Sequence, residues 1–248
     1  MNRYQDQAVA VTGAVQGLAR AMAERFAAEG ATVALADREG EAVAKAAEAL
    51  GANSRADAVD VSSSAAVEAW IADLDRTYGR IDALVGNAGI IRDNRAEDIS
   101  DDDWQAVLDV NISGAFYGAR AVLPVMRRRN YDRILSFSSM SWRGNFGQAN
   151  YVAAKAGVVG LTRALALETA RQGITVNAIA PGLIETPMLA SINDRARDKL
   201  TAKIAMRHTG DPTNIAEAAA FLCSPTARYI TGVVLDVDGG IGIGSSIR

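Results

Sequence analysis

The stretch AVAVTGAVQGLA, residues 8–19, decides the fold class of this chain. Ala8 to Val11 form a short apolar run typical of a buried strand, and a helical pattern with Met22 and Phe26 on one face follows the turn. Glycines in such a turn let backbone amides approach a pyrophosphate, and the helix N-terminus adds partial positive charge. A purely steric strand-to-helix connection has the same form, so the turn needs further support. The candidate phosphate-binding residues are Gly13, Gln16, Gly17 and Leu18.

The rest of the chain repeats this alternation of strand and helix. Six further apolar or β-branched runs occur at Thr32 to Ala36, Ser54 to Val59, Ala83 to Val85, Arg133 to Phe137, Ile174 to Ile179 and Val233 to Val237. Strands separated by stretches of helix length predict βαβ units with right-handed crossovers. We therefore predict an α/β fold, a Rossmann-like doubly wound sheet that is mainly parallel, with seven strands and helices on both faces.

No linker, charge block or internal repeat divides the chain, which predicts a single domain over residues 1–248. The longest irregular region lies near residues 181–207. We interpret it either as a mobile flap over a site, and so as a substrate loop, or as an exposed loop with a short helix. Asp211 and Pro212 then indicate a helix start, with the aspartate as cap and proline at the first helical position.

The composition argues against several classes of partner. Apolar residues make up 49% of the chain and charged residues 22%, as in soluble globular proteins. The net charge of −3 gives no general attraction for phosphate backbones, and Arg127 to Arg129 suit the solvated end of a helix, so we expect no nucleic-acid partner. The sequence has no run of about 18 apolar residues to span a bilayer. Residues 1–7 and the interrupted apolar stretch after them lack the form of a secretory signal, so we expect no membrane partner and a cytoplasmic location.

Cysteine and histidine each occur only once. Cys223 stands alone, so no internal disulfide can form, and His208 excludes a histidine-based triad or a multi-histidine metal centre. The run Asp101 to Asp103 precedes Trp104 and suits a helix N-terminus, where negative charge is favourable. We therefore expect no metal site.

The end of the second predicted strand indicates which dinucleotide binds. Asp37 lies about 20 residues beyond the glycine turn, where a carboxylate can accept hydrogen bonds from the adenosine ribose and repel the extra phosphate of NADP. Gln16 stands where a basic residue would help to hold that phosphate. Arg38 points the other way, because its guanidinium can still bind the extra phosphate of NADP. The simpler alternative is that Asp37 and Arg38 are only an ordinary polar strand end. We expect NAD(H), with NADP as the less favoured cofactor.

Tyr151 and Lys155 are the leading candidates for chemistry. Their four-residue spacing, at the start of a long helical pattern, places the phenol and the ammonium on one helix face. A phenol normally titrates near pH 10, and a neighbouring cation stabilises the phenolate and lowers its pKa. The pair therefore predicts a tyrosine that exchanges protons near neutrality. Because such pairs arise often by chance, the neighbouring segments must support it.

Over essentially the whole chain, the sequence resembles the short-chain dehydrogenase/reductase family. The matching pieces are Thr12-Gly13 to Ala19, Asp60-Val61, Asn87-Ala88-Gly89, Asn111, Ser138-Ser139, Tyr151 to Lys155, and Pro181-Gly182 with Thr186. The resemblance implies an oxidoreductase that interconverts a secondary alcohol and a ketone, with Tyr151 as general acid and base and Lys155 against the cofactor ribose. Ala19 replaces the usual last glycine of the turn, and Gly86 stands where the family often has another Asn. We expect cofactor binding to survive the change at Ala19, and the change at Gly86 to affect stability more than chemistry.

The resemblance also implies roles for residues around the pair. Asp60 and Val61 line the adenine pocket, and the segment from Asn87 through Ala88 to Gly89 steadies the sheet beside the cofactor. Asn111 distorts its helix and holds a water that relays protons toward Lys155; a solvated polar position is the simpler alternative.

The loop from Pro181 and Gly182 to Thr186 resembles the segment that receives the nicotinamide amide, through the Ile184 backbone and the Thr186 hydroxyl. Such contacts fix which face of the ring takes part in hydride transfer.

The serine of the family's catalytic set has two candidates here. Family spacing of thirteen residues before Tyr151 selects Ser138, whereas counting forward along the strand from Arg133 selects Ser139. Successive strand residues point to opposite sides, so only one can face the substrate. We prefer Ser139, with Ser138 in reserve, because the loop after the strand absorbs a one-residue deletion more easily. Trp142, in that loop, either walls the pocket or caps the helix beneath it.

The substrate is the least determined feature. Residues 89–94 and 147–151 look most like the 3-oxoacyl thioester reductases of the family, acting on acyl-carrier-protein or CoA thioesters, but those enzymes generally favour NADPH, against the indication from Asp37. A general NAD-dependent dehydrogenase of secondary alcohols, polyols or hydroxyacyl compounds is our first interpretation. The thioester reductase is the alternative, and a non-catalytic NAD-binding sensor is a remote one. The resemblance further implies a homotetramer built through two long helices and the C-terminal strand, and the apolar tail Tyr229 to Val237 agrees, although it also suits internal core.

Overall fold

A seven-stranded sheet forms the centre of the computed structural model, which describes residues 2–129, 131–190 and 193–243. The strands are β1 (Ala8–Thr12), β2 (Thr32–Asp37), β3 (Ser54–Ala58), β4 (Ala83–Gly86), β5 (Asp132–Phe137), β6 (Ile174–Pro181) and β7 (Val234–Val237). Their order is β3-β2-β1-β4-β5-β6-β7, and each neighbouring pair is parallel. The winding direction therefore reverses between β1 and β4, which confirms the doubly wound prediction; the sheet expected to be mainly parallel is parallel throughout the described residues.

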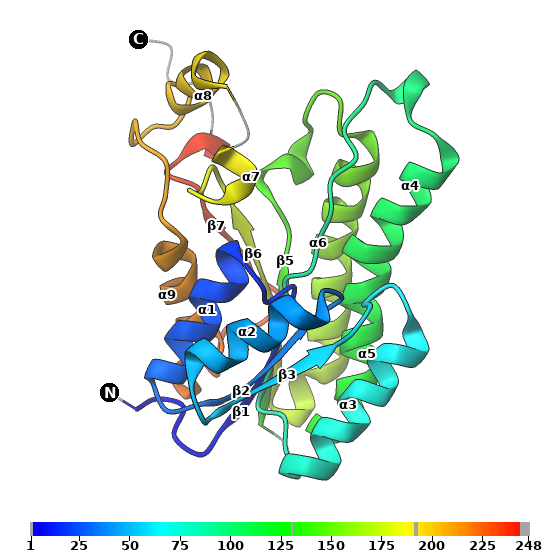
Figure 1. The fold of residues 1–248 in the computed structure, drawn as a ribbon, viewed down its shortest axis with the longest axis vertical. Coiled ribbons are helices and arrows are strands. Elements are labelled where there is room, and N and C mark those ends of the chain that lie inside the picture. The colour runs from blue at the N-terminus through cyan, green and yellow to red at the C-terminus, as the bar shows by residue number, and fades with distance from the viewer. Residues whose placement is uncertain (1, 130, 191–192, 244–248) are drawn as a thin grey trace.

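Helices cover both faces of the sheet (Figure 1). They are α1 (Gly17–Ala28), α2 (Gly40–Leu50), α3 (Ser64–Tyr78), α4 (Asp101–Leu108), α5 (Gly114–Arg127), α6 (Ala149–Thr169), α7 (Pro187–Ala190), α8 (Asp194–Thr201) and α9 (Pro212–Leu222). One hydrophobic cluster joins α1, α2 and α9 to the sheet, and a second joins α3, α5 and α6 to its other face. The two layers follow from right-handed crossovers that change side at the reversal.

Short turns connect these elements. They are the 3₁₀ turns η1 (Ala96–Asp98), η3 (Met140–Arg143), η4 (Ala170–Gln172), η5 (Pro225–Ala227) and η6 (Ile241–Ile243), and a π-turn, η2 (Asp109–Ser113), between α4 and α5. The region expected to be irregular, residues 181–207, contains α7 and α8. Residues 191–192 within it lie outside the described residues.

The helix starts follow capping signals in the sequence. Asp211 accepts a hydrogen bond from the Thr213 amide at 2.8 Å, and Asn214 accepts one from the Asp211 amide at 2.8 Å, which is a reciprocal capping box. Ser100 caps α4 by accepting from the Asp103 amide at 3.1 Å. The predicted helix start at Pro212 and the predicted N-terminus at Asp101 are thus confirmed.

The core beneath β1 holds the glycine turn in place. Met22 and Phe26 of α1 are fully buried, and the Tyr4 ring meets the Phe26 ring edge-on at 5.0 Å between centroids. Burying one such side chain stabilises the fold by about 1.5–3 kcal/mol. The first helix is therefore fixed against the sheet, with its N-terminus at the end of β1.

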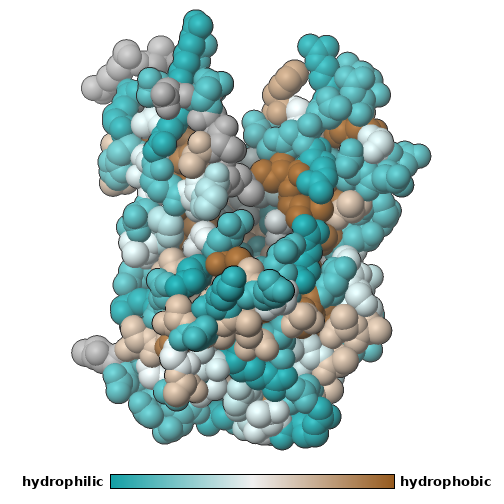
Figure 2. Space-filling view, viewed as in Figure 1, coloured by the Kyte–Doolittle hydropathy of each residue, from teal (hydrophilic) through white to brown (hydrophobic). Residues whose placement is uncertain are grey.

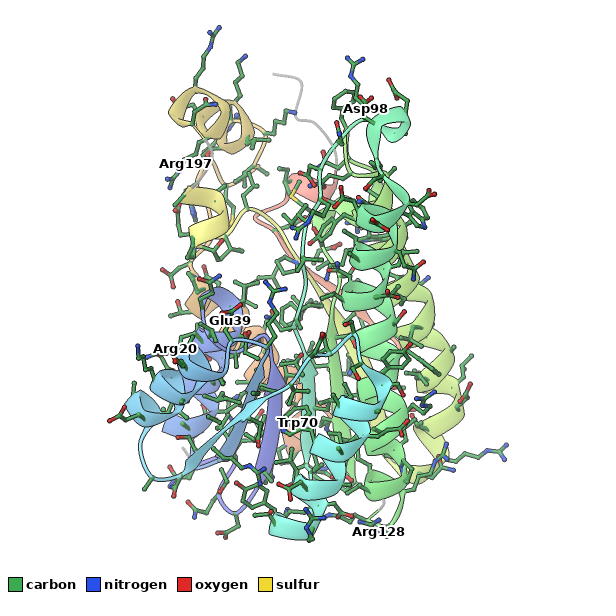
Figure 3. All side chains as sticks on the ribbon, turned by 45° about the vertical axis from the view of Figure 1, so that its right-hand side comes forward. Arg20, Glu39, Trp70, Asp98, Arg128 and Arg197 are labelled. Carbon is green, nitrogen blue, oxygen red and sulfur yellow. The ribbon has the colours of Figure 1, made fainter. Side chains whose placement is uncertain are left out.

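The carboxyl ends of the strands form one edge of the sheet, which we call the carboxyl edge; the opposite edge is the amino edge. At the carboxyl edge the surface is hollowed between two lobes, one with α7 and α8 and the other with η1 and α4, and hydrophobic side chains lie within the hollow (Figure 2). Arg197 and Asp98 mark these two lobes in Figure 3, while Arg128 lies at the amino edge. In the part of the chain that the structure describes, no helix combines the length and apolarity needed to cross a membrane.

Candidate active site

The glycine turn after β1 touches the segment after β4. Gly13 has a φ of +67°, and a Cβ at this position would lie 2.8 Å from the Cα of Ala88, so only glycine permits the contact. Next to it, the Thr12 hydroxyl accepts hydrogen bonds from the amides of Asn87 and Ala88, at 3.1 and 3.2 Å. Two segments that sequence reasoning assigned to one cofactor are therefore in direct contact.

The N-terminus of α1 faces the same place. Gln16 is its N-cap residue but makes no side-chain capping bond, so the amides of the first helical turn have no side-chain partner at the cap. Gly17, at a φ of +60°, has Thr186 as its neighbour, with the Thr186 Cγ2 3.6 Å from where a Cβ would lie. Uncapped amides at the start of a 12-residue helix, approached through glycine, fit a pyrophosphate. The structure thus brings Gly13, Gly17 and Thr186 together.

The predicted adenosine end of the site carries two carboxylates. Asp37, half-buried at the end of β2, accepts from the Val15 amide at 3.4 Å and from the Glu39 amide at 3.2 Å. Arg38 is exposed, with its Nε 3.4 Å from the Glu39 carboxylate. Asp60 accepts from the Ser62 amide at 2.9 Å and hydroxyl at 2.6 Å, and these bonds lower the pKa of its carboxyl.

A small cavity lies beneath this end, under Gly86. Its volume is about 20 Å³, and it is bordered by Val61, Ala88, Gly114 and Ser136 among others. A Cβ at Gly86 would meet its nearest neighbours only at 3.9 and 4.0 Å. The departure from the family at this position therefore leaves a space of about one water molecule beside the predicted adenine residues.

Tyr151 and Lys155 lie on one face of α6, as predicted. Lys155 is only 4% exposed, its Nζ donates to the Phe137 carbonyl at 2.9 Å, and it lies 5.4 Å from the centre of the Tyr151 ring. Burial lowers the pKa of Lys155 to about 8, because the charged form loses its hydration. The ammonium is therefore within proton-exchange range near neutrality.

The pKa of Tyr151 differs from our expectation. Burial of the phenol raises it, a hydrogen bond with Ser139 lowers it, and the nearby charge of Asp93 raises it. Lys155 was expected to lower this pKa, but desolvation of the phenol is the larger effect in the protein alone. The phenol is consequently held in its protonated form.

The two serines at the end of β5 have different surroundings. Ser138 is 3% exposed, and its hydroxyl donates to the Lys155 carbonyl at 2.9 Å, so it is engaged by the backbone of α6. Ser139 is the N-cap of η3, where its hydroxyl accepts from the Ser141 amide at 3.2 Å and also reaches Tyr151. The geometry favours Ser139 as the partner of Tyr151.

Asn111 sits in the π-turn η2, so its helix is locally distorted as the resemblance implied. Its amide nitrogen donates to the carbonyls of Ile90 and Val107, both at 2.9 Å, while its buried Oδ1 has no hydrogen-bond partner among the described residues. Gly89 separates this oxygen from Lys155: a Cβ there would lie 2.7 Å from Asn111 Oδ1 and 3.4 Å from Lys155 Nζ. Glycine is thus required for this close approach.

The loop after β6 is fixed against the end of β7. Gly182 is pressed onto Asp238, whose Cα would lie 2.6 Å from a Cβ at this position. Ile184 is buried, and the Thr186 hydroxyl donates to its carbonyl at 3.3 Å. Glu185 accepts hydrogen bonds from Thr209 and from Arg197 of α8, which lower the pKa of its carboxyl. The predicted nicotinamide loop therefore lies beside the glycine turn and is tied to α8.

Comparisons with known proteins agree with this arrangement. A family model described as enoyl-(acyl carrier protein) reductase matches residues 13–242. The chain belongs to the short-chain dehydrogenase/reductase family. The 3-oxoacyl-(acyl-carrier-protein) reductase FabG of Vibrio harveyi is 42% identical to it over 233 residues, which are 93% of this chain and 95% of that protein.

Two solved structures resemble this short-chain dehydrogenase/reductase closely. Levodione reductase superimposes with a TM-score of 0.93 at 35% identity, covering 97% of this chain and 99% of its own. A 3-ketoacyl-(acyl-carrier-protein) reductase from Brucella melitensis, complexed with NADH, has a TM-score of 0.90 at 36% identity, covering 96% and 99%. The Rossmann-like fold and the oxidoreductase family are therefore confirmed.

Several polar residues that support the site of this family member were missed from sequence. Asn145 donates to Gln148 at 2.7 Å, and Gln148 donates to Asp93 at 2.9 Å, which ties the loop after η3 to the loop after β4. Asn150 donates to the Arg92 carbonyl at 3.0 Å. Their amides cluster in the run GNFGQAN, residues 144–150, just before Tyr151, and that clustering was the available signal.

Trp142 proves to be a member of η3. It is half-buried, and the Arg143 guanidinium stacks on its ring at 4.6 Å. An open groove of about 490 Å³ lies beyond this loop, bordered by residues 94–97, residues 144–147, Ala149 and Val152. No group of acidic, cysteine or histidine side chains suited to a metal ion occurs among the described residues.

Proposed function

We propose that this protein is an NAD(H)-dependent oxidoreductase that interconverts a ketone and a secondary alcohol, with 3-oxoacyl thioesters as its substrate class. The observation that carries the proposal is the grouping of Ser139, Tyr151 and Lys155 at the carboxyl edge. Lys155 lies against Gly89, in the segment after β4 that also contacts the glycine turn through Ala88. In open α/β sheets, ligands bind at this edge, where the strand order reverses.

The protein's own groups bind and protonate the carbonyl oxygen. Ser139 and Tyr151 donate hydrogen bonds to it, and Tyr151 then transfers its proton to that oxygen. Burial keeps the phenol protonated, as a proton donor requires in the reductive direction. When bound, NADH supplies the hydride to the carbonyl carbon.

Proton supply to Tyr151 runs through Lys155 and Asn111. The unpartnered Asn111 Oδ1 and the Lys155 ammonium lie against the same glycine, an arrangement that suits a bridging water. Lys155 is also placed to bind the cofactor ribose, and its pKa near 8 lets it pass a proton on near neutrality. This relay rests on the family resemblance and on that geometry.

The preference for NAD rests on Asp37. Its carboxylate faces the glycine turn, where it would accept from ribose hydroxyls and repel an additional phosphate. The Brucella reductase that was solved with NADH is a further support, because it is a ketoacyl reductase of similar sequence.

The substrate class rests on the relatives. The thioester reductase FabG of Vibrio harveyi matches nearly the whole chain. We therefore take 3-oxoacyl thioester reduction, the alternative function in the sequence analysis, as the first candidate. The likeness to levodione reductase favours a second candidate, a small free ketone. Initial rates with acetoacetyl-CoA, compared with a panel of small ketones and secondary alcohols, separate the two. Tight NADH binding without turnover of any of them would instead indicate a non-catalytic NAD sensor.

Replacing Asp37 by Asn tests the cofactor assignment. We expect the ratio of kcat/KM for NADPH to that for NADH to rise about tenfold, because a repulsive charge is removed. The matched control is Glu48→Gln, which removes an exposed carboxylate from α2. An unchanged ratio in Asp37→Asn would contradict the assignment.

We further propose that the protein is a cytoplasmic homotetramer. Large apolar side chains are exposed on α5, on α6 and before β7: Phe116, Leu167 and Tyr229, the last fully exposed. Exposed apolar surface of this kind marks interaction sites. Light scattering should give four times the chain mass of 26.1 kDa; a monomer would contradict this.

A further inference from the structure

The position of the Ser139 hydroxyl depends on the turn η3. Ser139 caps the start of this turn and accepts two hydrogen bonds from it. Its hydroxyl accepts from the Ser141 amide at 3.2 Å, and its carbonyl accepts from the Trp142 amide at 3.0 Å. A movement of η3 therefore moves the serine hydroxyl relative to Tyr151.

Arg143, the last residue of η3, anchors the turn to β7. Its Nη1 and Nη2 donate to the two carboxylate oxygens of Asp236, at 3.1 and 2.6 Å. A two-point contact of this kind fixes orientation as well as distance. The Trp142 ring lies 4.6 Å from the same guanidinium, and the Gly242 backbone is close enough that a Cβ there would lie 3.1 Å from Nη1. The arginine is thus held on three sides.

Asp236 lies on the strand end that also supports the nicotinamide loop. It pairs in register with Ala180, and the Gly182 amide donates to the Val237 carbonyl at 3.0 Å. Asp238 contacts Gly182 and accepts from the amides of Gly240 and Gly242, both at 2.8 Å. The ion pair therefore joins the serine turn to the loop on the other side of the hollow.

We propose that Arg143 is a positioning residue, whose two-point ion pair with Asp236 holds η3 so that the Ser139 hydroxyl stays opposite Tyr151. The proposal rests on the proposed function, because the serine matters only if a carbonyl oxygen is bound there. Arg143 acts through the turn, since Asp236 already neutralises its charge.

A double-mutant cycle with Arg143→Ala, Asp236→Ala and the double variant tests the pair. For acetoacetyl-CoA reduction, each single variant should lower kcat about tenfold to a hundredfold, as a small displacement of a catalytic group does. The NADH dissociation constant should stay within about twofold, and the double variant should be no worse than either single one. Arg143→Lys keeps the charge without the fork and should regain only part of kcat.

Two controls separate positioning from general stability. Arg128→Ala removes an ion pair with Asp75, made at 2.6 Å at the amino edge, and should leave kcat unchanged. Hydrogen exchange of the amides of residues 141–144 should accelerate about tenfold in Arg143→Ala and not in Arg128→Ala. This measurement does not depend on enzymatic turnover.

The proposal is overturned if Arg143→Ala keeps kcat within about twofold, if the two single effects add, or if NADH affinity and melting temperature fall together with kcat. Unchanged exchange in residues 141–144 also overturns it. If the wild-type protein reduces no ketone, the proposed function fails, and the exchange measurement alone still decides whether Arg143 orders the turn.

Discussion

The two edges of the sheet bury similar groups in different ways. At the carboxyl edge, Lys155 lies 5.4 Å from the centre of the Tyr151 ring; at the amino edge, Arg133 lies 4.4 Å from the centre of the Tyr131 ring. Both cations are nearly inaccessible, at 4% and 1% exposure, and burial raises the pKa of both phenols. A half-buried tyrosine beside a buried cation is therefore not sufficient to identify an active site.

The bonding of the cations distinguishes the two edges. Arg133 donates to the carbonyls of Asp132, Gly173 and Ser224, at 2.9, 3.5 and 3.3 Å, and a guanidinium does not titrate in the physiological range. Lys155 donates only to Phe137 among the described residues, and its pKa of about 8 permits proton exchange. The carboxyl edge thus combines a titratable cation with the uncapped N-terminus of α1, whereas the cation of the amino edge is held by backbone carbonyls.

The largest expected effect distinguishes the two tyrosines. Tyr151→Phe should lower kcat for ketone reduction about a thousandfold, because the proton donor is lost, while NADH binding measured by fluorescence stays nearly unchanged. Tyr131→Phe removes a hydroxyl that is buried without a partner among the described residues, and it should leave kcat unaltered. Comparable turnover in both variants would remove the distinction between the two edges.

The serines provide the next comparison. Ser139→Ala should lower kcat about a hundredfold, because one donor to the carbonyl oxygen is lost. Ser138→Ala should instead lower the free energy of unfolding by about 1 kcal/mol, through its lost bond to the Lys155 carbonyl, with little change in kcat. Steady-state kinetics and urea unfolding of both variants measure this. The reverse pattern would make Ser138 the catalytic serine.

At the amino edge, Asp132 should make stability depend on pH. Burial and the neighbouring Asp82 raise the pKa of Asp132 from 3.8 to about 8, and neither carboxylate oxygen has a partner among the described residues. The folded state therefore favours the protonated form. Its stabilising contribution is complete below about pH 4 and is lost as the pH rises to about 8, a change of at most about 6 kcal/mol in the free energy of unfolding.

Asp132→Asn checks this dependence, because an amide does not titrate. Thermal and urea unfolding between pH 5 and pH 8.5 should show a smaller loss of stability in the variant than in the wild type. Asp98→Asn, which alters an exposed carboxylate at η1, is the matched control and should retain the wild-type slope. Equal slopes in Asp132→Asn and wild type would show that Asp132 is ionised in the fold.

Much of the fold and part of the candidate site could be predicted from the sequence, for identifiable physical reasons. The strand runs and capping residues are local signals, so the parallel sheet and the helix starts at Asp101 and Pro212 could be predicted. The four-residue spacing of Tyr151 and Lys155 likewise places both on one face of α6.

Other features depend on contacts between distant segments. In the protein alone, desolvation raises the pKa of Tyr151, an effect that the sequence does not display. The ion pair of Arg143 with Asp236 and the shared contact of Gly89 with Asn111 and Lys155 join residues far apart in the chain. The choice between Ser138 and Ser139 needed the strand's orientation relative to α6.

A crystal structure with NAD⁺ and a 3-oxoacyl thioester, which together cannot react, would show which hydroxyls bind the carbonyl oxygen. We predict that the carbonyl oxygen lies about 3 Å from both the Tyr151 and Ser139 hydroxyls, with Lys155 at the nicotinamide ribose and Asp37 at the adenosine ribose. A carbonyl oxygen bound away from Tyr151, or contacted by Ser138 in place of Ser139, would contradict the account.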